Sequence, residues 1–95
     1  MAKITLKWTD DGNKMTRQYN GVIEKQSKAV IEFNALSINE TQADYELTIE
    51  KFINLDPRRN VVHADTSQGN MRIVNIKPFT EFGLNVTSLL GVSSE

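Results

Sequence analysis

The alternation of apolar and polar side chains is clearest at the start of the chain. Over residues 3–8, three apolar residues alternate with polar ones, namely Ile4, Leu6 and Trp8. This period of two predicts a strand with one buried face. Asp11–Gly12 then predicts a two-residue hairpin turn, because both central residues of such a turn adopt positive φ. A hairpin folded there sets three pairs of residues opposite one another: Ile4 with Tyr19, Leu6 with Arg17, and Trp8 with Met15.

The pattern over residues 21–36 fits two kinds of element. Helical spacing gathers most of the apolar residues on one side but leaves Ile31 out. Strand spacing groups four residues on one face, namely Ala29, Ile31, Phe33 and Ala35. We expect a strand over about 28–36, preceded by an irregular turn around Gln26 and Ser27.

Residues 37–55 show the strongest helical signals in the chain. Ser37 and Glu40 have the spacing of a capping box, and Asp56–Pro57 is a suitable end for a helix. Helical spacing gathers one side from Ile38, Gln42, Tyr45, Ile49, Phe52 and Ile53. A strand also fits locally, since apolar Tyr45, Leu47 and Ile49 alternate with Glu46, Thr48 and Glu50. The cap and the length favour the helix.

The last third of the chain predicts more strands. Residues 60–65 and 71–77 have strand patterns, and Gly69 between them is suited to positive φ. The segment from 79 to 95 is too apolar for a solvated tail, so we expect it to complete the sheet or to dock as a swapped or partner-bound segment.

These elements predict an α+β fold in a single domain over residues 1–95. We expect an antiparallel sheet of about five strands, with the helix at about 37–55 on one face. The alternative is an all-β sandwich or small barrel, in which residues 43–53 form a strand.

Composition narrows the class of protein. The chain has 39% hydrophobic and 24% charged residues, which is ordinary for a soluble globular domain, and it has no cysteine. The first residues lack the pattern of a signal peptide, and no stretch reaches the roughly 18 apolar residues of a membrane span. We therefore expect a cytoplasmic protein, or a virion component if the chain derives from a phage, with no membrane partner.

Charge is balanced overall but uneven along the chain. The formal net charge is −1. Residues 1–30 carry six basic side chains against three acidic ones, whereas residues 31–56 carry one against six. This asymmetry predicts one acidic surface and a mildly basic first hairpin.

Residues suited to catalysis are few. His63 and Asp65 lie two apart on one predicted strand, and an imidazole beside a carboxylate is the arrangement of general-base chemistry. No serine has a spacing that places it beside His63, however. One histidine without cysteine disfavours a zinc site, and five scattered glycines form no phosphate-binding loop. We expect no catalytic residues, no metal and no cofactor.

We therefore expect a non-enzymatic protein-interaction or assembly module that binds itself or another protein. Chains of this composition suggest an accessory or virion protein of a bacteriophage or mobile element. The expected contact residues are Phe79, Phe82, Leu84, Leu89 and Leu90, with Glu46 and Glu50 as an acidic steering surface. One alternative is nucleic-acid binding through the basic side chains of the first hairpin, Lys3, Lys7, Lys14 and Arg17. Another is inhibition of a host protein through the acidic face of the helix.

Overall fold

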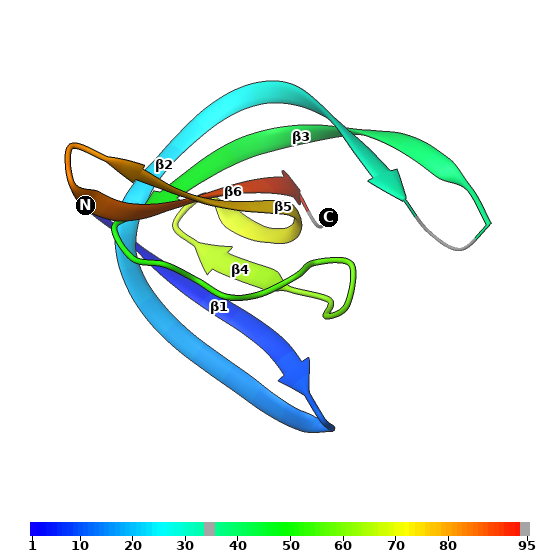
Figure 1. Ribbon diagram of the computed structural model, residues 1–95, viewed down its shortest axis with the longest axis horizontal. Coiled ribbons are helices and arrows are strands. Elements are labelled where there is room, and N and C mark those ends of the chain that lie inside the picture. Colours follow the sequence, from blue (N-terminus) through cyan, green and yellow to red (C-terminus); the bar gives the residue numbers. More distant parts are fainter. Residues whose placement is uncertain (34–35, 94–95) are drawn as a thin grey trace.

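The computed structural model describes residues 1–33 and 36–93, and the described chain forms strands and loops without a helix. The six strands are β1 Ala2–Asp10, β2 Asn13–Phe33, β3 Ile38–Ile49, β4 His63–Thr66, β5 Gly69–Glu81 and β6 Leu84–Ser93. They form one closed antiparallel barrel in the order β1-β2-β3-β6-β5-β4 (Figure 1). The barrel closes where three residue pairs join β1 to β4.

The predicted α+β fold with a main helix at 37–55 is wrong, and the small barrel named as the alternative is the observed architecture. The first part of this segment is β3, and residues 50–62 form a loop. β3 pairs with β2 on one side and with β6 on the other. Leu47 and Ile49 point into the core, so the local period of two was the correct signal. Pairing with a strand on each side stabilises this segment more than a capping box would stabilise a helix, because most of the stability of an element comes from tertiary packing.

The first hairpin confirms the sequence-based prediction in detail. Asp11 and Gly12 have φ values of 48° and 81°, as a two-residue turn of this kind requires. The three predicted pairs are all present: Ile4 with Tyr19, Leu6 with Arg17, and Trp8 with Met15. Turn chemistry and alternation agree here, so the register is specified locally.

Strand β2 is much longer than predicted, because it pairs first with one strand and then with another. Its first part pairs with β1 and its second part with β3, and the exchange occurs at Gly21, which lies opposite both Ala2 and Ile49. Gly21 is buried, and a Cβ there would collide with the carbonyl oxygen of Thr48 and lie 2.9 Å from Ile4 Cδ1. Only glycine allows the three strands to meet this closely.

The predicted turn at Gln26 and Ser27 is instead a β-bulge within β2. Lys25 lies opposite Tyr45 and Lys28 opposite Ala43, so three steps on β2 match two on β3. The extra residue reverses which side chains face inward.

This reversal decides which side chains of the strand predicted over 28–36 face inward. Val30 is only 6% exposed, whereas Ile31, which the strand spacing grouped with other apolar residues on one face, is 53% exposed. Ala29 of the same expected face is also exposed, and Ala35 lies outside the described residues.

Beyond the bulge, residues 28–33 and 38–43 extend past the barrel wall as a two-stranded ribbon, here called the arm (Figure 1). β3 pairs with β6 only from Tyr45 onward. The arm is held by a second small core, in which Val30, Ala43 and Val74 pack with Leu90 and Val92. An ion pair of 3.0 Å between Arg72 Nη1 and a carboxylate oxygen of Glu32 also joins the arm to β5.

The main core fills the barrel and extends under the loop 50–62. Its buried members are Ile4, Leu6, Leu47, Ile49, Ile53, Val62, Ala64, Met71, Ile73 and Leu89. The loop is fastened by the buried Thr87, whose hydroxyl accepts a hydrogen bond of 3.1 Å from the Ile53 N–H and donates one to the Lys51 carbonyl. The N–H of Ile73 donates to the Val62 carbonyl at 2.9 Å.

The C-terminal part of the chain completes the barrel, which is one of the two outcomes expected for it. β6 pairs with both β3 and β5. The strand predicted at 60–65 is present only from His63, where β4 begins, since residues 60–62 belong to the loop. The strand predicted at 71–77 lies within the longer β5, and Gly69 has the expected positive φ, 108°.

Thr87→Val should destabilise the protein by about 2–3 kcal/mol, because it leaves the Ile53 N–H and the Lys51 carbonyl without their partner. Chemical denaturation measures this free energy of unfolding. Thr87→Ser is the matched control, since it keeps the hydroxyl and removes one methyl group worth about 1 kcal/mol. Equal losses in the two variants would contradict the anchoring role of the hydroxyl.

Candidate protein-interaction site

The turn between β5 and β6 combines an unusual backbone with an unusual exposure. Phe82 and Gly83 are its central residues, with φ values of 51° and 76°. Glycine adopts positive φ freely, but a bulky side chain there costs about 1–2 kcal/mol. Phe82 is nevertheless 95% exposed, so it gains no packing within the protein in return.

Two further apolar side chains lie next to this turn. Leu84 is 51% exposed and lies opposite Glu81, and Phe79 is half-buried opposite the buried Val86. The register places Phe79 and Leu84 on the same face of the hairpin. We call Phe79, Phe82 and Leu84 the apolar tip. All three were predicted from the sequence as contact residues.

The other two predicted contact residues do not belong to this tip. Leu89 is fully buried in the main core, and Leu90 packs against the second core beneath the arm. Residues 89 and 90 are therefore structural. Alternation alone could not separate them from the tip, since apolar residues recur along the whole segment.

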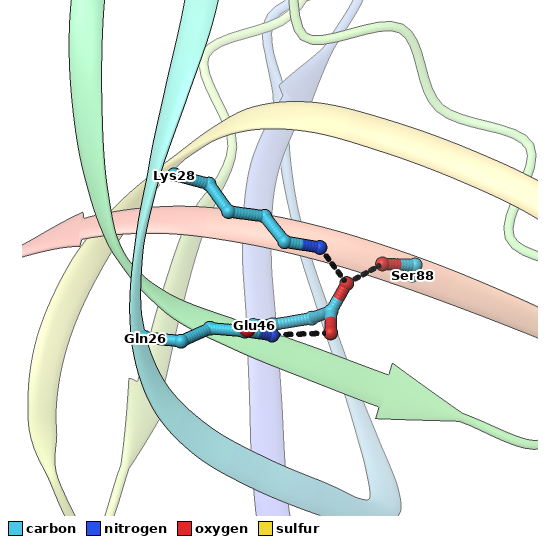
Figure 2. Close-up of polar contacts among 4 residues, drawn as sticks. All are labelled: Gln26, Lys28, Glu46 and Ser88. Atoms are coloured by element: carbon cyan, nitrogen blue, oxygen red, sulfur yellow. Dashed lines mark hydrogen bonds and ion pairs between the residues drawn. The ribbon is translucent and has the colours of Figure 1, made fainter.

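Glu46, predicted as part of an acidic steering surface, ties three strands together (Figure 2). Its Oε1 accepts a hydrogen bond of 2.7 Å from the Gln26 amide, and its Oε2 accepts one of 2.8 Å from the Ser88 hydroxyl. The ammonium of Lys28 lies 3.3 Å from the same Oε2. The carboxylate thus bridges β2 at its bulge, β3 and β6. Glu50, the other predicted steering residue, is exposed just beyond β3.

The same network shifts the titration of Glu46. Burial by itself would raise the pKa of its carboxyl, but hydrogen bonds from Ser88, Lys28 and Gln26 and the charge of Lys28 leave it below the ordinary value. The pKa of Glu32 on the arm is lowered in the same way, since the burial effect is outweighed by hydrogen bonds from Thr41 and Arg72 and by the arginine's charge. Both carboxyl groups are therefore ionised at neutral pH, and each links neighbouring strands through its hydrogen bonds and ion pair.

A groove lies between the arm, the loop 50–62 and β5, with a volume of about 530 Å³. Its lining residues are Ile31 and Glu32 of the arm, Leu55, Asp56, Pro57 and Arg58 of the loop, and Ile73, Val74, Asn75 and Ile76 of β5. A second β-bulge, between Ile73 and Asn75, shapes its floor. The sequence carried no signal for this groove, because its three walls come from distant segments.

The loop side of the groove is held in shape by Asp56. Its Oδ1 accepts hydrogen bonds from the Arg58 backbone N–H at 2.9 Å and from the Arg58 Nε at 3.3 Å. The backbone hydrogen bond is the main cause of the lowered pKa of Asp56, with further help from the Arg58 side chain and the charge of Arg59. Both arginine side chains are exposed, and Arg58 lines the groove.

The basic side chains of the first hairpin form no matching aromatic surface. Lys3, Lys7, Lys14 and Arg17 are all exposed, as the nucleic-acid alternative requires. Trp8 and Tyr19, however, pack against the main core and are not free to stack on bases.

Of the two residues considered for catalysis, one is exposed and the other is held in an ion pair. His63 is exposed at the start of β4. Asp65, two residues on, forms an ion pair with Lys7 of β1, where the two strands close the barrel.

Searches for other kinds of site and for relatives gave no positive result. In residues 1–33 and 36–93, no group of three or more histidine, cysteine, aspartate or glutamate side chains is arranged to hold a metal ion. A helix able to cross a membrane is not found in that part of the chain. Comparison with protein families, curated proteins and solved structures found no match.

Acidification should weaken the Glu46 tie. A carboxyl whose pKa is lower in the folded than in the unfolded state stabilises the fold above its ordinary pKa of about 4.3, and this contribution is lost as the pH falls through the folded-state value. Glu46→Gln should therefore cost about 1 kcal/mol at pH 7 and should lose less stability than the native protein between pH 6 and pH 3. Urea unfolding across this range measures both effects.

Glu50→Gln provides the control, because it removes an exposed carboxylate near the same strand end without touching the tie. Its free energy of unfolding at pH 7 should stay within about 0.5 kcal/mol of native. A parallel pH profile for Glu46→Gln and the native protein would show that this carboxylate does not hold the strands together.

Proposed function

We propose that this protein is a non-enzymatic assembly module that self-associates through the apolar tip of its β5–β6 hairpin. Phe82 carries the proposal, because its side chain is 95% exposed on a residue with a φ of 51°. Neither feature benefits the isolated chain. Backbone strain of this kind clusters at functional positions, where the surroundings or a partner compensate for it.

The energies favour burial of this side chain by a partner. A fully buried phenylalanine contributes about 1.5–3 kcal/mol relative to an exposed one, which is enough to offset the strain of about 1–2 kcal/mol at Phe82. Leu84 enlarges the apolar centre, and exposed Glu81 and Asn85 surround it with polar groups. A few apolar anchors inside a polar rim are the usual anatomy of a protein interface.

The two alternatives from the sequence have less support. Nucleic-acid binding through the first hairpin lacks free aromatic side chains, since Trp8 and Tyr19 pack inward, and the chain is slightly acidic, with a pI of about 5.8. Inhibition through an acidic helix face fails because no helix is present in the described residues, and Glu46 is occupied by the strand tie. The absence of cysteine suits assembly in a reducing compartment such as the cytoplasm.

Phe82→Asn should raise stability and weaken self-association at the same time. Asparagine tolerates positive φ better than phenylalanine, so the free energy of unfolding of the monomer should rise by roughly 1 kcal/mol. Loss of the anchor should weaken association at least tenfold. Chemical denaturation at high dilution measures the first effect, and sedimentation velocity over a concentration series measures the second.

Val61→Asn is the matched control, because it removes another exposed apolar side chain far from the tip in sequence and should leave association unchanged. A native protein that sediments as a monomer at all concentrations up to about millimolar would refute the proposal. So would a Phe82→Asn variant that associates as strongly as the native chain.

A further inference from the structure

Two opposite charges flank the aromatic residue of the tip that lies within β5. Lys77, Phe79 and Glu81 occupy every second position of this strand, so their side chains lie on one face of the β5–β6 hairpin. Leu84 pairs with Glu81 and lies on the same face. Phe79 is half-buried and the other three residues are exposed. We call these four residues the tip face. Figure 1 shows the hairpin turn at the far left, away from the arm.

The two charges of the tip face are free within the described residues. Lys77 and Glu81 are four residues apart on an extended strand, which separates them by about 13 Å and prevents an ion pair between them. In residues 1–33 and 36–93, neither side chain has another ion-pair or hydrogen-bond partner. The carboxylate of Glu46, which bonds to Ser88 opposite Lys77, is already paired with Lys28. A partner can therefore neutralise both free charges.

A second copy of this chain supplies the complementary charges. If two tip faces pack with their β5 strands antiparallel and a two-fold axis at Phe79, Lys77 of each copy meets Glu81 of the other. The two Phe79 rings then meet at the centre. Parallel packing would instead set like charges against each other.

We infer that two copies associate face to face through their tip faces, in the antiparallel arrangement with a two-fold axis at Phe79. This inference rests on the proposed self-association and specifies its interface. The contact uses the same surface on both copies, so it closes at a dimer and cannot continue into a ring or a filament.

The contact uses the face of the hairpin, because the edge of β5 is unsuited to a further strand. β4 pairs with β5 only as far as Arg72, so the edge beyond it is open within the described residues. Pro78 lies in the middle of this edge and has no backbone N–H to donate. A proline on an edge strand disfavours the addition of another strand.

The same overlap provides a contact for Phe82. Because β5 runs in the opposite direction in the second copy, the turn of each copy extends past Phe79 of the other, toward its Asn75 and Leu90. These two residues pair with each other. Leu90 is half-buried beside the arm and offers apolar surface there. The dimer thus covers the exposed phenylalanine ring that carries the proposed function.

Charge reversals test this arrangement. Lys77→Glu sets two glutamates against each other at both ends of the contact, and Glu81→Lys sets two lysines against each other. Each change replaces two attractions by two repulsions, so each variant alone should dimerise about tenfold more weakly than the native chain. The variant with both changes restores opposite charges and should dimerise like the native chain. Sedimentation velocity over a concentration series measures all four proteins.

A mixture of the two single variants gives a second measurement. Lys77→Glu makes both charged positions of the tip face acidic, and Glu81→Lys makes both basic. The mixture should therefore form a one-to-one heterodimer about as stable as the native dimer. Native mass spectrometry with one variant isotopically labelled separates this heterodimer from the two homodimers.

Lys14→Glu is the matched control, because it reverses the charge of an exposed lysine on the first hairpin, outside the tip face. It should dimerise like the native chain. Circular dichroism and unfolding midpoints confirm that every variant keeps the native fold.

The outcomes separate the inference from the function on which it rests. Weak single variants, recovery in the double variant and a preferred heterodimer support the antiparallel dimer. If Phe82→Asn weakens association but the charge reversals leave it unchanged, or the double variant stays weak, the tips meet in another way and only the inference is overturned. Native assemblies larger than a dimer also overturn it. A native chain that stays monomeric up to about millimolar concentration refutes both the inference and the proposed function.

Discussion

The architecture depends on one strand, β2, which exchanges its partner at Gly21. Before this residue β2 pairs with β1, and after it with β3, so a single chain segment joins the first hairpin to the rest of the barrel. The exchange requires close backbone approach, which a Cβ at Gly21 would prevent. The bulge a few residues later then reverses the inward face, which turns Val30 toward the second core and holds the arm over β5 and β6.

The groove is a consequence of these two irregularities together with the loop anchor. The arm provides one wall because the bulge and the Glu32–Arg72 ion pair hold it in place. The loop provides another because the Thr87 hydroxyl holds its backbone. The apolar tip differs from all of these elements, since it exposes apolar surface at a strained backbone position. The strands and the loop are thus held by many contacts, whereas the turn at Phe82 is locally unfavourable.

Sequence patterns predicted the first hairpin and its register, together with the turn at Gly69, because these features depend on residues that are neighbours along the chain. They failed for residues 37–55, where the Ser37 cap favoured a helix although the period of two around Leu47 was also visible. Pairing with β2 and β6 decided between the two patterns, and both partners are distant in sequence. The same applies to Ile31, whose exposure follows from a β-bulge at a position where the sequence indicated only an irregular turn.

For the site, the sequence by itself determined that the C-terminal third carries more apolar side chains than a solvated segment would, and it included Phe82 and Leu84 among the candidates. Only the tertiary structure decided which of them remain available for contact. Leu89 is enclosed by strands from across the barrel, whereas Phe82 lies on a turn that nothing covers within the described residues. Turn geometry is a local property of the backbone, but burial depends on which distant segments pack against a side chain.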